Sequence, residues 1–438
     1  MTASLTQSAL GAQYVKAHKT DTIFTRGHFH RYATGVWEPI ADFTINTELW
    51  DLLETWEHRD GSCRPTANLL RGVLKYIQDH VYVAEDEVDA HPDLINLING
   101  TYSLSLRQLL THDAARYLTT QLPFAHDVSA KCPIWKYWLS TSLTYPAPQE
   151  LTHDDSLATF LQEAVGYSLT DDISYHISFW CHGSGANGKG VLFYVLEQLA
   201  GTSAVPFNVN LLKRDRYQLA DLAGKRVALC SESSSWDNVV EDGDVKALIA
   251  GDRMNVRQIR ERPFTLEPKV KLWWSMNRLP AVVDTSGGFW RRVLVLPFNR
   301  SFAVKERILD LKDQLIEELP GIFNWSIVGL ERLHANGAFS VPTQVKAFTD
   351  AFQAESNNVG TFVEDECIKD DAAEIRTATL YDNFREWCKR NGFRAYSSRS
   401  FRREMETLQF YMIRRSDGRY FQGVGVKVQS SREPIDYS

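Results

Sequence analysis

The chain of 438 residues has 44% hydrophobic and 24% charged residues, a composition that fits a soluble globular protein of about two to four domains. Its formal net charge of −7 gives no overall preference for nucleic acid, so such binding must depend on local basic surfaces. There is no membrane-length apolar run or signal peptide, and the six cysteines form no C-x-x-C pair. We therefore expect a cytoplasmic protein with no membrane contact, reduced thiols and no structural zinc.

The N-terminal region is predicted to hold a β-hairpin around His28 and His30, followed by mostly helical pattern over residues 46–165. Two alternating histidines without other clustered ligands do not predict a metal site. We divide this part of the chain into an N-terminal region, 1–90, with the hairpin and helices, and a helical domain, 91–165.

Residues 183–190 match the pattern G-x-x-x-x-G-K of a phosphate-binding loop. The apolar residues 175–181 before it predict a buried strand, and residues 191–199 after it can form a helix. In such a loop, backbone N–H groups converge on phosphate oxygens and the lysine reaches the terminal phosphates. The alternative, a glycine turn between core elements, gives the lysine no role. The predicted nucleotide-binding residues are Gly183, Ser184, Gly185, Ala186, Asn187, Gly188, Lys189, Gly190 and Val191.

Gly190 stands where such loops usually have Ser or Thr, whose hydroxyl ligates Mg²⁺. Either water fills this coordination position or another residue supplies the oxygen. We predict no certain metal ligand in the chain and expect Mg²⁺ to be held through the nucleotide and Glu232.

Two further apolar strands are predicted to end in polar side chains. Residues 227–230 lead to Glu232, which could polarise the attacking water or hold Mg²⁺ through water, and residues 271–276 lead to Asn277, which could orient that water. A surface glutamate after a strand is common, so the first of these signals is weak by itself.

Arg291 and Arg292 precede another predicted strand, 293–297. A guanidinium there could stabilise charge on the nucleotide of a neighbouring subunit, as an arginine finger does. The alternative for each arginine is an ordinary surface ion pair.

The order of these motifs resembles the superfamily 3 helicases, specifically the phage and plasmid primase–helicases that include satellite-phage and poxvirus-type proteins. The resemblance extends outside the motif region in both directions. The stretches that carry it are 99–102, 132–135, 166–167, 183–189, 222–226, 246–252, 264–271, 277–280, 290–298, 320–325 and 329–330.

The resemblance implies an AAA+-like P-loop ATPase with a parallel sheet over residues 166–335, a hexameric ring, and ATP and Mg²⁺ as cofactors. Lys189 would contact phosphate, Glu232 would be the catalytic acid and Asn277 the sensor. Arg292 would be the finger because it directly precedes the strand, with Arg291 as the alternative.

It also implies a replication protein of a phage, plasmid or integrated element, in the host cytoplasm, that acts on single-stranded and forked DNA. The sequence shows no strand with paired carboxylates that could bind the catalytic metal ions of nucleotide polymerisation. We therefore expect no primase activity in this chain. A separate primase or polymerase partner remains open.

Residues 253–271 predict a hairpin with a basic tip, and in the resembling helicases this hairpin tracks single-stranded DNA inside the ring. The alternative is a solvated hairpin. The residues predicted to contact DNA in this region are Lys246, Arg257, Arg260 and Arg262.

The C-terminal segment is rich in Lys and Arg, and its pattern predicts two helices followed by a hairpin, as in a winged helix. We place a linker at 336–365 and this basic domain at 366–438, with Arg399, Arg402 and Arg403 on the recognition helix. The alternative is a basic module that docks protein.

Two other functions stay open. One is a replication-accessory ATPase that loads or remodels a partner, and which would not need Arg260 and Arg262. The other is an ATP-regulated winged-helix DNA-binding initiator, whose DNA binding would require the residues from about 370 onward. A small-molecule kinase is disfavoured because it has no use for a basic hairpin.

Overall fold

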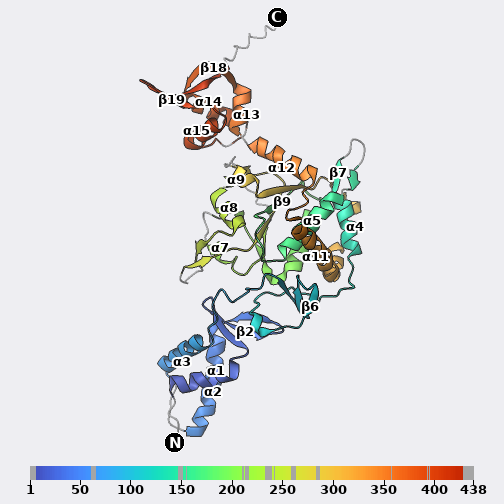
Figure 1. The fold of residues 1–438 in the computed structure, drawn as a ribbon, viewed down its shortest axis with the longest axis vertical. Helices are drawn as coiled ribbons and strands as arrows, with labels where there is room; N and C mark the ends of the chain where they lie inside the picture. Colours follow the sequence, from blue (N-terminus) through green and yellow to red (C-terminus); the bar gives the residue numbers. More distant parts are fainter. Residues whose placement is uncertain are drawn as a thin grey trace.

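The computed structural model describes residues 6–60, 66–146, 151–153, 155–209, 212, 217–231, 239–240, 242–257, 263–282, 287–356, 358–391, 393 and 395–427. The molecule is elongated, with the N-terminal and C-terminal regions at opposite ends of a central α/β unit (Figure 1). No helix among these residues has both the length and the apolar character needed to cross a membrane.

The N-terminal region packs three helices against a small antiparallel sheet. The predicted hairpin is present, because the strand that contains His28 and His30 pairs with the strand that follows it. Apolar side chains of all three helices, such as Leu10, Leu49 and Val73, form a core of their own. The elements are α1 (Gln7–His18), β1 (Thr22–Thr25), β2 (His28–Ala33), β3 (Val36–Ile40), α2 (Asp42–Asp60) and α3 (Ala67–His80).

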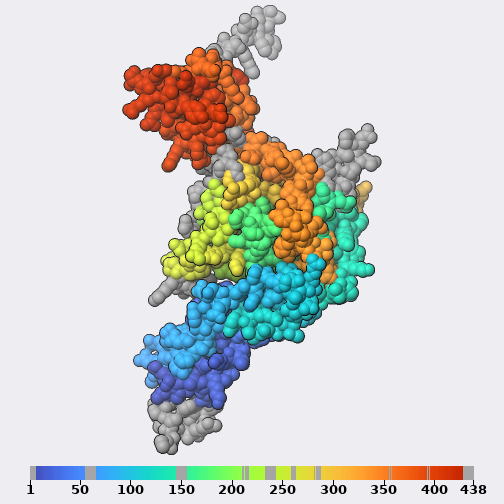
Figure 2. Space-filling model, in the orientation of Figure 1, coloured from blue at the N-terminus to red at the C-terminus, as the bar shows by residue number. Residues whose placement is uncertain are grey.

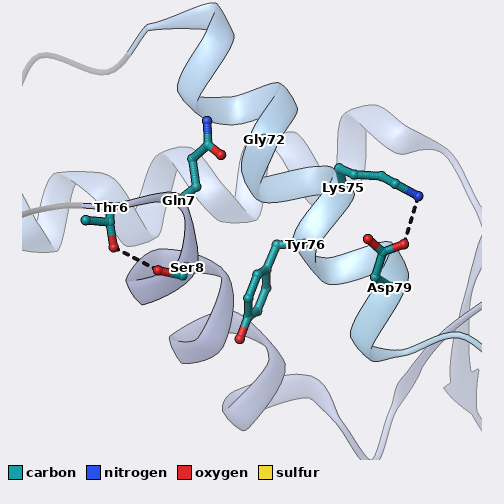
Figure 3. Close-up of a pocket in the computed structure, with 7 residues that line it drawn as sticks. All are labelled: Thr6, Gln7, Ser8, Gly72, Lys75, Tyr76 and Asp79. Carbon is teal, nitrogen blue, oxygen red and sulfur yellow. Dashed lines mark hydrogen bonds and ion pairs between the residues drawn. The ribbon is translucent and has the colours of Figure 1, made fainter.

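An open pocket of about 530 Å³ lies between the first turn of α1 and helix α3 (Figure 3). Its one lysine, Lys75, is paired with Asp79 at 2.8 Å, so the pocket offers no free cation to an anionic ligand. It lies in the N-terminal region, away from the predicted nucleotide loop.

The prediction of a helical domain over 91–165 is wrong for its first part, which forms a three-stranded antiparallel sheet. The hairpin signal was present, because Asn99-Gly100 is a dipeptide that favours tight turns; Gly100, with a φ of 156°, begins β5 and is paired with Leu97. Helices follow only after residue 132. The elements are β4 (Leu94–Leu97), β5 (Gly100–Ser103), β6 (Gln108–Leu110), η1 (Ala114–Arg116), α4 (Pro133–Ser142), β7 (Thr144–Pro146), β8 (Leu151–His153) and α5 (Asp155–Ser168).

A five-stranded parallel sheet forms the centre of the molecule, as predicted, in the order β10-β11-β15-β9-β17. Its inner strands are apolar and buried on both faces, which is typical of parallel sheets covered by helices. The elements up to the last strand are β9 (Ser178–His182), α6 (Lys189–Ala200), η2 (Gly201–Ser203), β10 (Ala204–Pro206), α7 (Tyr217–Ala220), β11 (Val227–Cys230), β12 (Val239–Val240), α8 (Asp242–Ala250), β13 (Met254–Val256), β14 (Phe264–Leu266), β15 (Lys271–Met276), β16 (Ala281–Val282), α9 (Gly287–Trp290) and β17 (Val293–Pro297).

Helices cover both faces of this sheet (Figure 1). On one face α5 packs closely against α11 (Leu319–Asn336). The contact requires glycine, because a Cβ on Gly166 would lie 2.3 Å from the Ser326 carbonyl oxygen. Before α11 the chain forms η4 (Val304–Glu306) and α10 (Leu311–Glu317). Glu318 accepts the N–H groups of Ile134 and Trp135 at 2.9 and 2.8 Å and so caps the start of α4.

The predicted linker at 336–365 is wrong as an open connection, since it contains α12 (Thr343–Ser356) and most of α13 (Asn358–Glu366). Helix α12 lies along the edge strand β17, where Thr349 Oγ1 accepts the Val295 N–H at 3.0 Å. Phe352 of the same helix is buried against the sheet. The helix therefore belongs to the core of the central unit.

The C-terminal region forms a lobe of its own (Figure 2). Its apolar core contains only residues from 359 onward. The two predicted helices and the hairpin are present, and an additional strand, β18, completes a sheet of order β18-β20-β19. The elements after α13 are β18 (Cys367–Arg376), α14 (Thr377–Arg390), α15 (Ser398–Thr407), β19 (Met412–Arg415) and β20 (Gly418–Val426).

A buried lysine lies at the amino end of β15. The Lys271 ammonium group donates to the Thr170 carbonyl and lies 4.9 Å from the centre of the Tyr167 ring. Arg226 and Asp171 form an ion pair of 2.8 Å nearby. Burial lowers the pKa of Lys271 to about 7, with the charge of Asp171 opposing this effect.

This shift predicts a pH-dependent stability. Between pH 7 and 10.5 the unfolded lysine keeps a proton that the folded one releases, so the free energy of unfolding should rise with pH by up to about 1.4 kcal/mol per unit. Lys271→Met should lack this rise of the unfolding free energy with pH, whereas Lys346→Met, at an exposed site on α12, should keep it. Urea unfolding of the three proteins across this pH range measures the slopes. Equal slopes for wild type and Lys271→Met would contradict the assignment.

Candidate nucleotide-binding site

Three strand ends meet at the carboxyl edge of the central sheet, where ligands bind in open α/β folds. Met276 is level with His182 in the pairing of β15 with β9, so Gly183 and Asn277 follow directly at the same edge. The Gly183 N–H donates to the Met276 carbonyl at 3.2 Å. On the other side, the Phe298 N–H donates to the His182 carbonyl at 2.7 Å. The predicted glycine loop therefore starts between the ends of β15 and β17.

The Lys189 side chain lies at the centre of this edge and is only 4% exposed. Its ammonium group donates to Asn277 Oδ1 at 2.8 Å and to the Gly183 carbonyl at 2.5 Å. The structure thus brings together two residues that the sequence analysis selected from different strands. Both acceptors are uncharged, so the ammonium has no carboxylate partner in these two bonds.

The loop backbone takes conformations that suit glycine. Gly185 and Gly188 have φ angles of 102° and 93°, and Ala186 also has a positive φ, of 48°. Within the described chain, the N–H groups of Gly185, Gly188 and Gly190 donate to no protein acceptor. They lie at the start of the 12-residue helix α6. Unpaired N–H groups at a helix N-terminus beside a lysine form a site for an anion such as a phosphate.

Contacts from outside the motif hold the loop in place. The Phe302 N–H donates to the Ala186 carbonyl at 2.7 Å, and Asn187 Nδ2 donates to the Phe298 carbonyl at 3.4 Å. Behind the loop, Ser142 of α4 lies 3.0 Å from the position that a Cβ on Gly188 would occupy. The sequence analysis missed Phe302 and Ser142, because neither belongs to a recognisable pattern.

His182, at the end of β9, adds an uncharged ring next to the loop. Burial lowers its pKa, and the positive charge of Lys189 lowers it further. A neutral histidine does not neutralise an incoming anion, so Lys189 remains the cation of this edge.

The structure says less about the two positions that the sequence analysis linked to Mg²⁺, Gly190 and Glu232. A Cβ on Gly190 would have no heavy atom of the described residues within 4 Å, so this position faces open space. Glu232 lies outside the described residues. The strand before it, β11, is level with β15, with Cys230 paired to Trp274. The site therefore fits the phosphates of a nucleotide, and Mg²⁺ would depend on oxygens beyond position 190.

Arg292 lies at the opposite edge of the sheet. Its carbonyl accepts the Ser178 N–H at 2.7 Å at the start of β9, and the five residues of β17 separate it from the loop edge by roughly 16 Å. Its guanidinium donates to the Gly288 carbonyl. Arg291 is exposed. Neither arginine reaches the loop of its own chain.

The structure contains the predicted hairpin, since β13 and β14 pair antiparallel. At the loop end of this hairpin, directly after β13, the Arg257 guanidinium donates to the Tyr217 hydroxyl at 2.9 Å and lies 5.7 Å from the ring centre. Lys246 is half-buried on α8. Arg260 and Arg262 lie outside the described residues.

The three arginines predicted on a recognition helix all lie on α15. Arg399 is exposed, whereas Arg402 donates to the Ser398 carbonyl at 3.0 Å. Arg403 lies 3.7 Å from the Glu404 carboxylate and is 61% exposed. Two of the three charges are therefore available to solvent, and a contact with DNA remains a prediction.

Three segments of the chain match known protein families. Residues 15–143 match the family described as D5 N terminal like, and residues 354–419 match the family described as Poxvirus D5 protein-like. Residues 181–292, which include the glycine loop, match a family of unknown function (DUF5906).

The curated relatives are proteins of large DNA viruses. "Putative helicase L207/L206" of Acanthamoeba polyphaga mimivirus is 24% identical over 270 residues, which cover 56% of this chain and 28% of that protein. "Putative helicase 184R" of Invertebrate iridescent virus 6 is 24% identical over 362 residues, covering 72% of this chain and 36% of that protein. The chain thus corresponds to about a third of the length of these relatives.

Among solved structures, the A-form apo structure of the NrS-1 C-terminal region is similar over nearly the whole chain. The TM-score is 0.51 at 13% identity, and the match covers 96% of this chain and 100% of the other. At this identity the similarity shows that the two proteins share a fold.

The open space at Gly190 predicts the effect of restoring a hydroxyl. Gly190→Ser should reduce the Mg²⁺ concentration needed for half-maximal nucleotide binding on the order of tenfold, because a serine there supplies the oxygen that such loops use for the metal. Thermal shift with ATP at graded Mg²⁺ concentrations measures the change.

The matched control is Gly188→Ser. Its side chain would crowd Ser142 at a backbone φ of 93°, so it should destabilise the protein by about 1 kcal/mol or more and weaken nucleotide binding. An identical Mg²⁺ dependence in wild type and Gly190→Ser would show that position 190 does not face the metal.

Proposed function

Because the chain belongs to the phage- and poxvirus-type primase–helicase family, we propose that it is an ATP-driven, ring-forming DNA helicase of superfamily 3. The observation that carries the proposal is the junction of Lys189 and Asn277 at the carboxyl edge of the sheet, beside a loop with unpaired N–H groups. This arrangement can hold a triphosphate, with the polar side chain of Asn277 next to its terminal phosphate.

In the proposed reaction the ammonium of Lys189 exchanges its carbonyl acceptor, Gly183, for an oxygen of the terminal phosphate. A charged acceptor forms a stronger bond than a carbonyl. Asn277 then orients the attacking water, and Glu232 takes up its proton or polarises it. Mg²⁺, if held through the nucleotide and Glu232, would supply positive charge against the phosphate oxygens.

The proposal requires a second copy of the chain at each site. Arg291 and Arg292 lie at the sheet edge opposite to Lys189, so either of these two arginines would reach a nucleotide only from a neighbouring subunit. Sites shared in this way close into a ring when the contact repeats by rotation, and a hexamer is the proposed number.

Single-stranded and forked DNA are the proposed substrates. The hairpin of β13 and β14, with Arg257 at its loop end, would contact the phosphate backbone inside the ring, together with Lys246 of α8. The C-terminal lobe would bind duplex DNA as a winged helix. We place this activity in the replication of a viral, phage or plasmid-type element in the host cytoplasm, with priming or polymerisation supplied by another protein or domain.

Complementation between inactive variants tests the shared site. Lys189→Ala should lose triphosphate binding, and Arg292→Ala should lose about 1,000-fold in hydrolysis rate, as expected for an arginine finger. Neither should unwind a forked duplex. A mixture of the two should regain hydrolysis, because some interfaces then combine an intact Lys189 with an intact Arg292. ATPase and unwinding assays with single-stranded DNA measure both effects.

Arg291→Ala is the control variant for Arg292→Ala, since it removes the exposed arginine that precedes Arg292. If Arg291→Ala is inactive and Arg292→Ala is active, the finger is Arg291. If both hydrolyse ATP at the wild-type rate and the wild type opens no fork, the motor proposal fails. Wild-type hydrolysis without unwinding would then favour a replication-accessory ATPase.

The C-terminal arginines predict a salt-dependent contact with DNA. Arg399→Ala and Arg403→Ala should each lower the slope of log affinity against log salt by about 1, because each removes one cation that neutralises a phosphate. Arg107→Ala, which removes an exposed arginine outside this lobe, should leave the slope unchanged. Duplex binding measured by fluorescence anisotropy over a salt series gives the slopes. Unchanged slopes in both α15 variants would favour a lobe that docks protein.

A further inference from the structure

A polar contact joins the C-terminal lobe to the central unit at Tyr396. This residue lies between α14 and α15 and is 6% exposed, although it belongs to a lobe with its own core. Its hydroxyl lies 2.7 Å from the Ser356 carbonyl, at the end of α12, and 3.4 Å from the Val282 carbonyl on β16. One side chain of the lobe therefore meets both the connecting helix and the central unit.

The hydroxyl has one hydrogen and two carbonyl acceptors. The phenol stays protonated at neutral pH because burial raises its pKa, and the charge of Glu404 raises it further. In this structure the shorter distance favours the bond to Ser356 over the bond to Val282. A small movement of the lobe can therefore transfer the hydrogen bond from one carbonyl to the other.

Val282 is close in the chain to the predicted sensor. Strand β15 ends at Met276, Asn277 follows, and five residues later Val282 lies on β16. Strand β16 pairs in parallel with β12, with Val240 level with Val282. In the chain, β12 comes after β11 and β16 comes after β15. The β12–β16 pair therefore links the parts of the chain that follow these two neighbouring central strands. Five residues of chain thus join Asn277 to Val282, a short path by which a displacement of β16 can reach Asn277 and its bond with Lys189.

We propose that Tyr396 is a positioning residue through which the C-terminal lobe sets the arrangement of β16 and, with it, of Asn277 in the nucleotide site. The consequence for hydrolysis rests on the proposed function, whereas the mechanical coupling does not. In this view, DNA bound to the lobe changes the hydrolysis rate at a site to which it makes no contact.

The test compares Tyr396→Phe with Tyr381→Phe in the full chain. Tyr381 donates to the Tyr396 carbonyl at 2.8 Å, so its loss removes a tyrosine hydroxyl bond inside the lobe without touching the central unit. Hydrogen exchange of the amides from 277 to 282 should accelerate about fivefold in Tyr396→Phe, the effect of one net hydrogen bond. It should be unchanged in Tyr381→Phe. This readout does not depend on any ATPase activity.

The second readout is hydrolysis with and without duplex DNA. Tyr396→Phe should lower kcat and abolish its change on DNA binding, while leaving KM near the wild-type value, because nucleotide contacts are intact. Unchanged exchange in Tyr396→Phe, or equal acceleration in both variants, would overturn the coupling. Faster exchange with a wild-type kcat would overturn the link to Asn277. If wild type hydrolyses no ATP, the proposed function fails and the exchange result alone decides the coupling.

Discussion

Burial of the Lys189 ammonium group is the constraint on which the centre of this molecule depends. A buried cation is strongly destabilising unless acceptors replace its water. Here the acceptors are the Gly183 carbonyl and the Asn277 amide oxygen, which follow two neighbouring strands. They come within reach of one ammonium only because β9 and β15 are parallel and end at the same level.

The same constraint leaves the site ready for an anion. The Gly183 carbonyl and the Asn277 amide oxygen are uncharged acceptors of the ammonium, and the adjacent glycine N–H groups add further positive potential. A carboxylate in place of Asn277 would pair with Lys189 and compete with phosphate. An amide holds the lysine in position without this competition.

The sequence analysis was most successful where local pattern determines structure. The glycine loop, the apolar strands and the β13–β14 hairpin have signals within a few residues, and the structure contains them. The sequence analysis did not predict the contact of Asn277 with Lys189, which follows from the rule that parallel strands end at one edge.

The failures involve contacts between distant segments. Helix α12 has an ordinary amphipathic sequence, and only its packing against β17 shows that it belongs to the core. The contact of Tyr396 with Val282 joins positions that are far apart in the chain, so no local sequence pattern predicts it. The sheet at 94–110 is different, because Asn99-Gly100 signalled a turn that a helical reading of the region overlooked.

The geometry of the sheet also limits how copies of the chain can assemble. Residues that precede a parallel strand and residues that follow one lie at opposite edges, so Arg292 and Lys189 of one chain are separated by the full length of β17. Extension of the sheet by a second copy at β17 is blocked, since Thr349 of α12 already accepts the Val295 N–H there. A neighbour that brings an arginine to the loop must therefore approach along the strand ends, with the edge of one sheet facing the opposite edge of the next. That head-to-tail contact uses two different surfaces, and such contacts give a closed ring when the rotation between neighbours closes and an open filament when it does not.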